Sequence, residues 1–548
     1  MRIARFLPFL SWPRLSRELL AGELQAGLTV GLMVIPQGVA YAALAGMPLI
    51  TGIYASLLPT LIAVLFSRSV RLSVGPTALS CLLISASLAG LAHPSSDDWV
   101  NLAIWLALIS GGLQVFLGAM RFGWLLNIVT APVLMAFTQA AAVLIIGSQL
   151  KDLVGIGELQ SLSAALQQWD QSAAAFGLGA LVILTLSRHW KPAFPTVLVV
   201  VLVSAAVSLW FGFAERGGRV VGFLPQGMPG FQIPHWPGLV VLRELLVPAF
   251  VITAISFLET AASAKVDNAQ RGTGWDQDQD LIGQGLSKLA AGFSGAFPTS
   301  SSFSRSALNL YAGARSGWAT VFSVVVVGLA LQWFLPILYH VPKAVLAAIV
   351  VVAVIGLIRP HEFIGLWRIS RAESIIAVVT FAVTVITAPE LYWGVLTGVI
   401  LALSHFVYWR MHPRIIEVGL HPDGRLRGRK EWNLPAIHSQ TYLLRMDAAL
   451  DFGSAAALEQ AIGNHLALAP DTRNVVLLAS GINRIDATGV AVFSRLRRQL
   501  AQQQCVLMIV GLKLPVQRAL ERSGNLSKGP YFSVVSNESE AVDAINSI

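Results

Sequence analysis

The sequence predicts a helical membrane protein that ends in a small α/β domain. Hydrophobic residues make up 55% of its 548 residues and charged residues only 12%, about half the charged share of a soluble protein. The charges are unevenly spread, with 39 in the first 409 residues, 9 in the next 24 and 19 in the last 115. We therefore expect an N-terminal segment (1–22), a transmembrane domain (23–409), a basic linker (410–433) and a soluble domain (434–548).

Fourteen apolar segments are expected in the transmembrane domain, each read from a window of about 20 residues. The basic stretch before the first segment lacks the long apolar core and cleavage site of a signal peptide, so we expect it to remain on the chain. The segments lie near 23–43, 50–67, 76–92, 99–119, 125–149, 172–187, 194–213, 244–264, 279–294, 302–313, 317–336, 344–358, 372–388 and 391–409.

Basic residues in the loops orient the chain in the membrane. Fifteen Lys and Arg residues precede the first segment or fall in alternate loops on that side, against five in the opposite loops. Because basic loops stay in the cytoplasm, the N-terminus is expected there. An even number of segments returns the chain to the same side, so both termini and the soluble domain are expected in the cytoplasm, with the rest in the cytoplasmic (inner) membrane. This distribution also explains the net charge of +9, so the charge does not indicate nucleic-acid binding.

The third and tenth segments are too short to cross a membrane. Each begins with a Pro-Thr pair, Pro76-Thr77 and Pro298-Thr299, behind a Gly-containing approach. Three and ten are seven apart, and interrupted segments at matching positions of two halves point to a transporter binding site in mid-membrane. A half-helix that begins inside the bilayer presents unpaired N–H groups and the positive end of its dipole. Two such ends facing each other would hold an anion.

Five stretches of the sequence carry a family resemblance. They are VIPQGVAYAALAGMPLITGIYASLLPTLI (34–62), SVGPTA (73–78), ISFLETAASAKV (255–266), SSFSRSALN (301–309) and NRIDATGVAVF (483–493). Together they resemble the sulfate permease family of anion transporters. The resemblance implies two inverted seven-segment repeats, divided into a uracil-permease-like core and gate, an elevator-like motion and a homodimer. It also implies transport, not enzymatic activity, with a small anion of the sulfate, bicarbonate, chloride or dicarboxylate class as the substrate.

Arg305 is the strongest candidate for binding the substrate. An arginine one turn into an apolar half-helix costs at least ~2.5 kcal/mol unless it faces a cavity or a partner. We interpret it as an anchor for the anion, and the resemblance places the Ser304-Arg305 pair near the substrate. Ser304 would donate a hydrogen bond from its hydroxyl group, and Phe303 would line the site. The structural alternatives are that Arg305 snorkels or pairs with an acid, that the serine bonds to its own helix and that Phe303 only packs.

Segment 1 and the start of segment 3 complete the predicted binding site. Gln37 and Tyr41 are four residues apart and share a helix face, where they can offer an amide and a phenol to an oxyanion. The resemblance places both at the site, whereas their residue types alone are equally typical of helix packing. Thr77 and Ala78 would contribute backbone N–H groups, and Thr77 its hydroxyl as well.

Glu259 is the candidate for coupling transport to a cation. It lies deep in the eighth segment, where burial disfavours the charged form of a carboxyl group. We expect it to bind a proton that travels with the anion; the structural alternative is a fixed ion pair with Arg305 or Lys288. Nearby hydroxyl groups leave sodium open as the coupling ion: Ser256, Thr260 and Ser263. A second carboxylate, Glu23, is interpreted as a helix N-terminal charge near the cytoplasmic face.

The C-terminal domain alternates apolar strands with helices, which predicts a sheet covered by helices and resembles the STAS fold. In related bacterial regulators a phosphorylated serine occupies an Asp-Ser-Ser-Gly loop. The matching residues here are Asp486, Ala487, Thr488 and Gly489, so only Thr488 keeps a hydroxyl, and a helix N-terminal role is the simpler interpretation of it. Without nucleotide or metal motifs, the domain is expected to stabilise a dimer or to bind a cytoplasmic regulatory partner.

These observations predict a homodimeric, proton-coupled secondary transporter of small anions that contacts membrane lipids and no nucleic acid. No metal or cofactor is expected beyond a co-transported proton or sodium ion, and Cys81 and Cys505 provide no disulfide framework. Three alternatives remain open. They are a sodium-coupled bicarbonate symporter, an uncoupled anion exchanger or channel, and a membrane signalling scaffold that uses its STAS domain.

Overall fold

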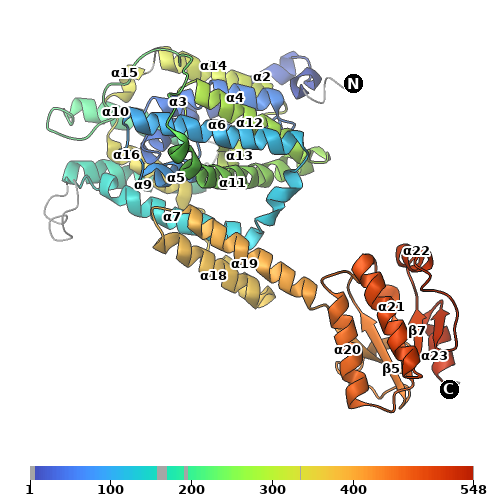
Figure 1. Cartoon of the computed structure of the whole chain (residues 1–548). Helices are drawn as coiled ribbons and strands as arrows, with labels where there is room; N and C mark the ends of the chain where they lie inside the picture. The colour runs from blue at the N-terminus through green and yellow to red at the C-terminus, as the bar shows by residue number, and fades with distance from the viewer. Residues whose placement is uncertain (1–6, 157–169, 191–194, 334, 547–548) are drawn as a thin grey trace. The chain divides into compact units, whose positions relative to one another are not determined.

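The computed structural model describes residues 7–156, 170–190, 195–333 and 335–546 (Figure 1). They form two compact units, Met1–Ala402 and Leu403–Ile548. The first is helical apart from one two-stranded sheet, and the second is a six-stranded sheet with helices.

Each predicted apolar segment corresponds to helical structure. The second segment is broken into α3 and α4, and α17 lies in a loop that was not expected to be helical. The helices are α2 (Arg17–Leu44), α3 (Thr51–Tyr54), α4 (Leu58–Phe66), α5 (Ala78–Leu88), α6 (Asp97–Ala119), α7 (Ala131–Leu153), α9 (Gln171–Trp190), α10 (Thr196–Trp210), α11 (Leu239–Arg271), α12 (Gln277–Phe293), α13 (Phe303–Tyr311), α14 (Trp318–Trp333), α15 (Leu335–Leu338), α16 (Lys343–Ile355), α17 (Pro360–Ile369), α18 (Arg371–Ile386) and α19 (Tyr392–Met411).

Length and composition alone identify only some of these helices as membrane spans. Among the described residues, six helical stretches are long and apolar enough, beginning at Arg17, Asp97, Ala131, Leu239, Lys343 and Tyr392. The half-helices α5 and α13, with 11 and 9 residues, are too short to span, as predicted. That the chain crosses the membrane fourteen times stays a prediction.

The helices of the first unit pack in pairs that repeat between its two halves. Helix α2 packs on α14, and α11, which occupies the position of α2 in the second half, packs on α6. In the same way α13 packs on α2 and α5 packs on α11, while α18 packs on α7 and α9 packs on α16. Two copies of seven segments related by a two-fold axis produce these matched pairs, which is the arrangement of inverted repeats.

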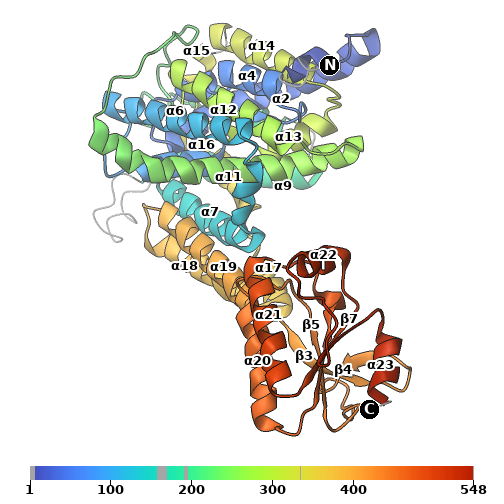
Figure 2. The same ribbon diagram turned by 45° about the vertical axis from the view of Figure 1, so that its right-hand side comes forward.

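These contacts divide the first unit into two groups of helices. We call α2 to α6 together with α11 to α14 the site group, and α7, α9, α10, α16 and α18 the flanking group. Figures 1 and 2 show α6, α11 and α12 side by side within the site group. Every predicted substrate and coupling residue lies in the site group.

Helices α6 and α12 touch along their backbones. A Cβ atom added to Gly111 would lie 2.8 Å from the Gly285 carbonyl oxygen and 2.9 Å from the Cβ of Lys288, and one added to Gly285 would lie 2.7 Å from the Gly111 carbonyl oxygen. Small residues allow such close approach between membrane helices. The contact therefore fixes α12, and Lys288 on it, against α6.

The second unit is an α/β sheet in the strand order β4-β3-β5-β6-β7-β8, with β5 to β8 parallel. Leu444 on β5 joins a cluster with α20, α21 and α22, whereas its neighbour Leu443 joins the cluster on the other face with α23 (Figure 2). The elements are β3 (Ile415–Leu420), β4 (Leu426–Gly428), β5 (Thr441–Met446), α20 (Ala455–Leu468), β6 (Asn474–Leu478), α21 (Ala487–Gln502), β7 (Val506–Val510), α22 (Leu514–Arg522), β8 (Phe532–Val535) and α23 (Glu538–Asn546).

The prediction that residues 410–433 form a linker is wrong. It contains β3 and β4, and β3 pairs antiparallel with β5 in the register Ile415 with Met446. The sheet therefore begins before Leu434. The basic residues of this stretch suggested a solvated linker, but they flank apolar side chains such as Val418, which is buried in the sheet.

Two neighbouring glycines test the packing of α6 on α12. Gly111→Ala places a methyl group against the backbone of α12, and we expect a loss of about 1–3 kcal/mol of stability. Gly112→Ala is the matched control, because a Cβ there meets nothing within 4 Å and alanine favours the helix by up to ~1 kcal/mol. Thermal melting of the purified protein in detergent should show a lower Tm for the first variant only. Equal melting of both variants would contradict the close approach.

Candidate functional site

The two interrupted segments meet at a short antiparallel sheet. Strand β1 (Val74–Gly75) pairs with β2 (Ser300–Ser301), with Val74 opposite Ser301 and Gly75 opposite Ser300. Helix α5 begins just after β1, and α13 begins just after β2. The prediction that segments 3 and 10 correspond is confirmed, because both helix N-termini lie at the ends of one two-residue ladder.

Each half-helix is capped by a hydroxyl group. Thr77 accepts a hydrogen bond from the Ser80 N–H at 3.3 Å, and Ser302 accepts one from the Arg305 N–H at 3.4 Å. The remaining N–H groups of each first turn keep the positive end of the helix dipole directed at the ladder. Ala78, the first residue of α5, is buried at this end.

Glu259 reaches the N-terminus of α5. The Thr77 hydroxyl donates to its Oε2 at 3.3 Å, and Ser300 lies beside the carboxyl group. The structure therefore brings two predicted site residues from α5 and α11 together. It does not support a fixed ion pair for Glu259. The salt bridges among the described residues of the first unit are Arg71–Asp267, Arg219–Asp152, Arg271–Asp267 and Arg359–Glu362.

Arg305 points into the same region and is 1% exposed. Its Nε donates to the Ser73 hydroxyl at 3.3 Å, whereas its Nη2 has no hydrogen-bond partner among the described residues. A Cβ at Gly75 would lie 3.3 Å from this Nη2, so the absence of a side chain there makes room for the guanidinium. A buried N–H donor without a partner carries a desolvation cost that an anion would relieve.

Helix α2 contributes Tyr41 and Gln37, both 5% exposed. Tyr41 lies within electrostatic range of Arg305 and Glu259. Gln37 follows Pro36, which lies within the helix, and its Oε1 has no hydrogen-bond partner in the described part of the chain. The structure thus joins Tyr41 to the cluster and leaves Gln37 with unused hydrogen-bonding capacity in the same buried helix.

Phe303 and Ser304 lie on the open side of the first turn of α13. Phe303 is 57% exposed, and the Ser304 hydroxyl lies 3.4 Å from that of Ser302. Neither has a hydrogen bond to Glu259 or Arg305 within the described residues. Their role at the substrate site stays a prediction.

Two residues of this cluster were not selected from the sequence. Cys81 lies one turn after Thr77, is fully buried and is within electrostatic range of Glu259 and Arg305. Ser73 supplies the hydroxyl that holds Arg305. The i, i+4 spacing from Thr77 could have identified Cys81, whereas nothing in the sequence pairs Ser73 with a residue 232 positions away.

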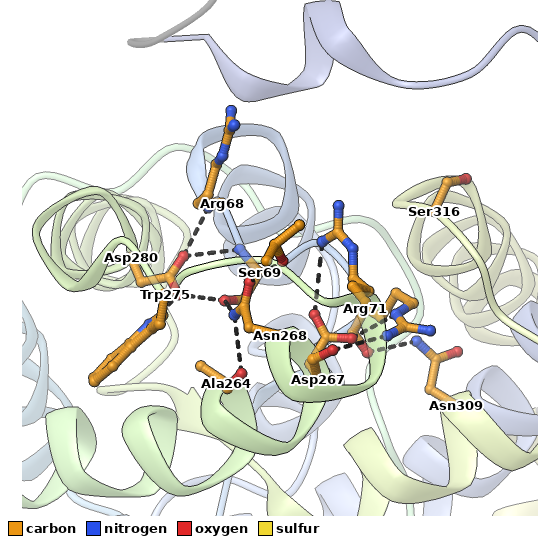
Figure 3. A network of polar contacts seen from close by, with 12 residues as sticks. Arg68, Ser69, Arg71, Ala264, Asp267, Asn268, Trp275, Asp280, Asn309 and Ser316 are labelled. Carbon is orange, nitrogen blue, oxygen red and sulfur yellow. Dashed lines mark hydrogen bonds and ion pairs between the residues drawn. The ribbon is translucent and has the colours of Figure 1, made fainter.

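A polar network fixes the loop that leads into β1 (Figure 3). Asp280 accepts hydrogen bonds from the N–H groups of Arg68 and Ser69, at 2.7 and 3.0 Å. Arg71 forms a salt bridge with Asp267, and its carbonyl accepts from Asn309 Nδ2 at 2.9 Å. Helices α11, α12 and α13 thereby hold the approach to the ladder.

Glu23 caps another helix, which corrects the interpretation of its charge. It lies inside α2, six residues after that helix begins, and is fully buried. Its Oε1 accepts from the N–H groups of Arg315 and Ser316, at 3.0 and 2.7 Å, and from the Ser316 hydroxyl; its Oε2 accepts from the Ala319 N–H at 2.8 Å. Glu23 therefore satisfies the N-terminus of α14. Sequence spacing could not identify this partner.

The loop of the second unit that resembles a phosphorylation site is organised by Asp486. Its carboxylate accepts from the Gly489 and Phe452 N–H groups at 2.8 and 3.0 Å. Burial alone would raise the pKa of Asp486, but these N–H groups outweigh it and lower the pKa. Asp486 is thus the N-cap of α21, and Thr488 is exposed in the first turn.

The comparisons with known proteins agree with this architecture. The sulfate permease family model matches residues 20–380, and the STAS domain model matches 434–540. The chain is 30% identical to "Probable sulfate transporter 4.2" of Arabidopsis thaliana, over 92% of this chain and 77% of that protein. It belongs to the sulfate permease family. The predicted family is confirmed, and the relatives of this member of the sulfate permease family are transporters, not enzymes.

Further relatives and solved structures support the same assignment. A probable sulfate transporter of Mycobacterium tuberculosis is 28% identical over 93% of both chains. The structure of murine Slc26a9, an anion transporter in the inward-facing state, superposes with a TM-score of 0.87 at 20% identity and covers 100% of this sulfate permease family chain and 95% of that one. The transmembrane domain of the cyanobacterial bicarbonate transporter BicA gives a TM-score of 0.59 at 19% identity, covering 71% and 98%. These likenesses show the fold: a multi-pass helical membrane domain followed by a STAS domain.

Glu23 provides a test that separates a structural carboxylate from a coupling one. In Glu23→Gln an amide NH₂ replaces an acceptor oxygen and faces a buried N–H donor of α14. We expect a loss of about 1–3 kcal/mol of stability and a lower Tm in detergent, with the pH dependence of uptake unchanged in vesicles reconstituted at equal protein content. A variant that melts normally but loses pH dependence would assign Glu23 to coupling.

Proposed function

We propose that the protein imports a small anion together with a proton across the cytoplasmic membrane. The observation that supports this most directly is the meeting of three groups at one ladder: two half-helix N-termini, the Arg305 Nη2 and the Glu259 carboxyl group. Among the described residues, this Nη2 has no hydrogen-bond partner and this carboxyl group forms no salt bridge. The first two attract an anion and the third can take up a proton. A site with this composition selects its ligand by charge and size, so sulfate, bicarbonate, chloride and dicarboxylates are all suitable substrates.

Proton coupling fits the hydroxyl groups around Glu259 better than sodium coupling does. The Thr260 hydroxyl donates to the Ser256 carbonyl at 2.8 Å, and the Ser263 hydroxyl donates to the Glu259 carbonyl at 3.1 Å. The third hydroxyl group near Glu259 on its own helix, that of Ser256, accepts from Lys288 Nζ at 2.7 Å. A sodium ion bound there would lie beside a cationic side chain, whereas a proton on Glu259 needs no oxygen cage.

The membrane potential makes this coupling useful. Moving one charge across 100 mV costs about 2.3 kcal/mol, so a monoanion entering an inside-negative cell moves against that potential. One co-transported proton makes the step electroneutral. A single coupling carboxyl group therefore suits a monoanion, or a dianion taken up in singly protonated form.

The placement of the site supports an elevator-like mechanism. All predicted site residues belong to the site group, so a movement of this group past the flanking group would carry the anion with its binding residues.

We also propose that both termini are cytoplasmic and that the transporter is a homodimer in contact with membrane lipids. The STAS domain would stabilise the dimer or bind a regulatory partner.

Arg305→Ala tests the anion site. We expect loss of anion binding, by at least about tenfold, because the arginine whose Nη2 is available to an anion at the ladder is removed from a buried site. Equilibrium binding of labelled anion to the purified protein measures this, and gel filtration checks folding. Arg305→Lys retains the charge and should bind with intermediate affinity. An unchanged affinity in the alanine variant would refute the role of Arg305.

Tracer uptake into proteoliposomes tests coupling. Sulfate, bicarbonate, chloride, nitrate and fumarate are supplied with and without an inward proton gradient, to wild type and to Glu259→Gln. The gradient should drive uptake of the substrate in wild type, and the variant should lose this dependence because a glutamine side chain carries no exchangeable charge. Uptake that ignores the gradient in wild type, or keeps its dependence in Glu259→Gln, would refute proton coupling through Glu259.

A further inference from the structure

A second buried cation lies in the site group, outside the predicted site. Lys288 on α12 is fully buried, and its Nζ donates to Gln114 Oε1 on α6 at 2.8 Å and to Ser256 Oγ on α11 at 2.7 Å. Both acceptors are neutral. No salt bridge involves Lys288 in the described residues, so its ammonium group is solvated by two dipoles without a counter-ion in contact.

A serine of α11 links this ammonium group to Glu259. Ser256, which accepts from Lys288, precedes Glu259 by three residues on α11, so the two side chains share a helix face. A charge on Glu259 therefore acts electrostatically on the ammonium group of Lys288. The two side chains form no salt bridge among the described residues, so their charges interact without a direct contact.

The surrounding helices supply no alternative partner for Lys288. Helix α4 contains no ionisable side chain, and the acidic residues of α6 are confined to its first turn, far from Gln114. Besides Lys288 on α12, the ionisable groups around Glu259 are Tyr41 on α2, Cys81 on α5 and Arg305 on α13. Of these only Arg305 is cationic. The cluster thus consists of two cations, one carboxyl group and neutral groups.

Packing prevents Lys288 from leaving this position. Its Cβ lies where a side chain on Gly111 would collide, at the backbone contact between α6 and α12. Burying an isolated ammonium group costs free energy. A lysine side chain can reduce this cost by extending to water, but the tight packing around Lys288 opposes such a movement. A charge retained under these conditions is expected to serve the function of the site.

We infer that Lys288 is a charge-compensating residue that couples the protonation of Glu259 to anion binding. When Glu259 is ionised, its charge offsets that of Lys288, and Arg305 is left as the net cation of the cluster. When Glu259 takes up a proton, this compensation ends, and both Lys288 and Arg305 attract the anion. Proton uptake therefore strengthens anion binding. This inference deepens the proposed function and rests on it for the identity of the coupling residue.

The decisive experiment titrates Glu259 itself, without any substrate. The infrared carboxyl band of the full-length protein is recorded against pH, and the Glu259 component is identified by its absence in Glu259→Gln. In Lys288→Gln, loss of a nearby positive charge should move the midpoint of this band to higher pH, by about one unit. Lys288→Arg keeps the charge and should leave the midpoint in place. An unchanged midpoint in Lys288→Gln would overturn the inference even if proton-driven uptake is confirmed.

A four-member stability cycle keeps the inference falsifiable if Lys288→Gln is poorly folded. Thermal melting in detergent compares wild type, Glu259→Gln, Lys288→Gln and the double variant, with solution pH high enough to ionise Glu259. If the two charges compensate each other, the double variant loses less stability than the sum of the single losses. Additive losses would show that Lys288 only fills space. Failure of gradient-driven uptake in wild type would instead refute the proposed function and leave the result of this cycle standing.

Discussion

The structure of the transport unit depends on how an interrupted chain satisfies its backbone inside a membrane. Hydrocarbon offers no hydrogen bonds, so a break in a helix is tolerated only where other protein groups replace the missing partners. Here each break supplies hydrogen-bond partners for the backbone of the other, through the pairing of β1 with β2. The same pairing directs two helix N-termini at one place. The solution to a backbone problem thus creates an electropositive site from main-chain groups alone.

The buried carboxylates differ in how completely their surroundings satisfy them. Glu23 accepts from three backbone N–H groups and a hydroxyl, and Asp280 accepts from two backbone N–H groups, a hydroxyl and an indole. Asp267 is paired with arginine. Such surroundings provide hydrogen-bond or ionic partners for the oxygens of a buried carboxylate. Glu259 instead accepts a hydrogen bond from the Thr77 hydroxyl and forms no salt bridge among the described residues, and this difference supports its proposed role in coupling.

The sequence predicted those features that follow from local composition. Apolar windows located the helices, and the Pro-Thr pairs at Thr77 and Thr299 located the two breaks, because a break has a local signature. Partners distant in the chain have none. The sequence could show that Glu23 and Lys288 are charges within apolar segments, but only the fold shows that Glu23 caps α14 and that Lys288 is held by Gln114 and Ser256. Strand β3 was missed for a related reason, since its pairing with β5 outweighs the basic residues around it.

Rigid placement of the charges would give the proposed coupling its physical basis. If Lys288 and Arg305 could move, they would follow the charge on Glu259, and the field at the anion would change little when a proton binds. The backbone contact between α6 and α12 holds Lys288, and the hydroxyl of Ser73 together with the space at Gly75 holds Arg305. The proton is therefore the charge that changes while the cations stay fixed. An elevator-like movement of the whole site group would preserve this geometry on both sides of the membrane, so a coupling free energy established at one side would still apply at the other.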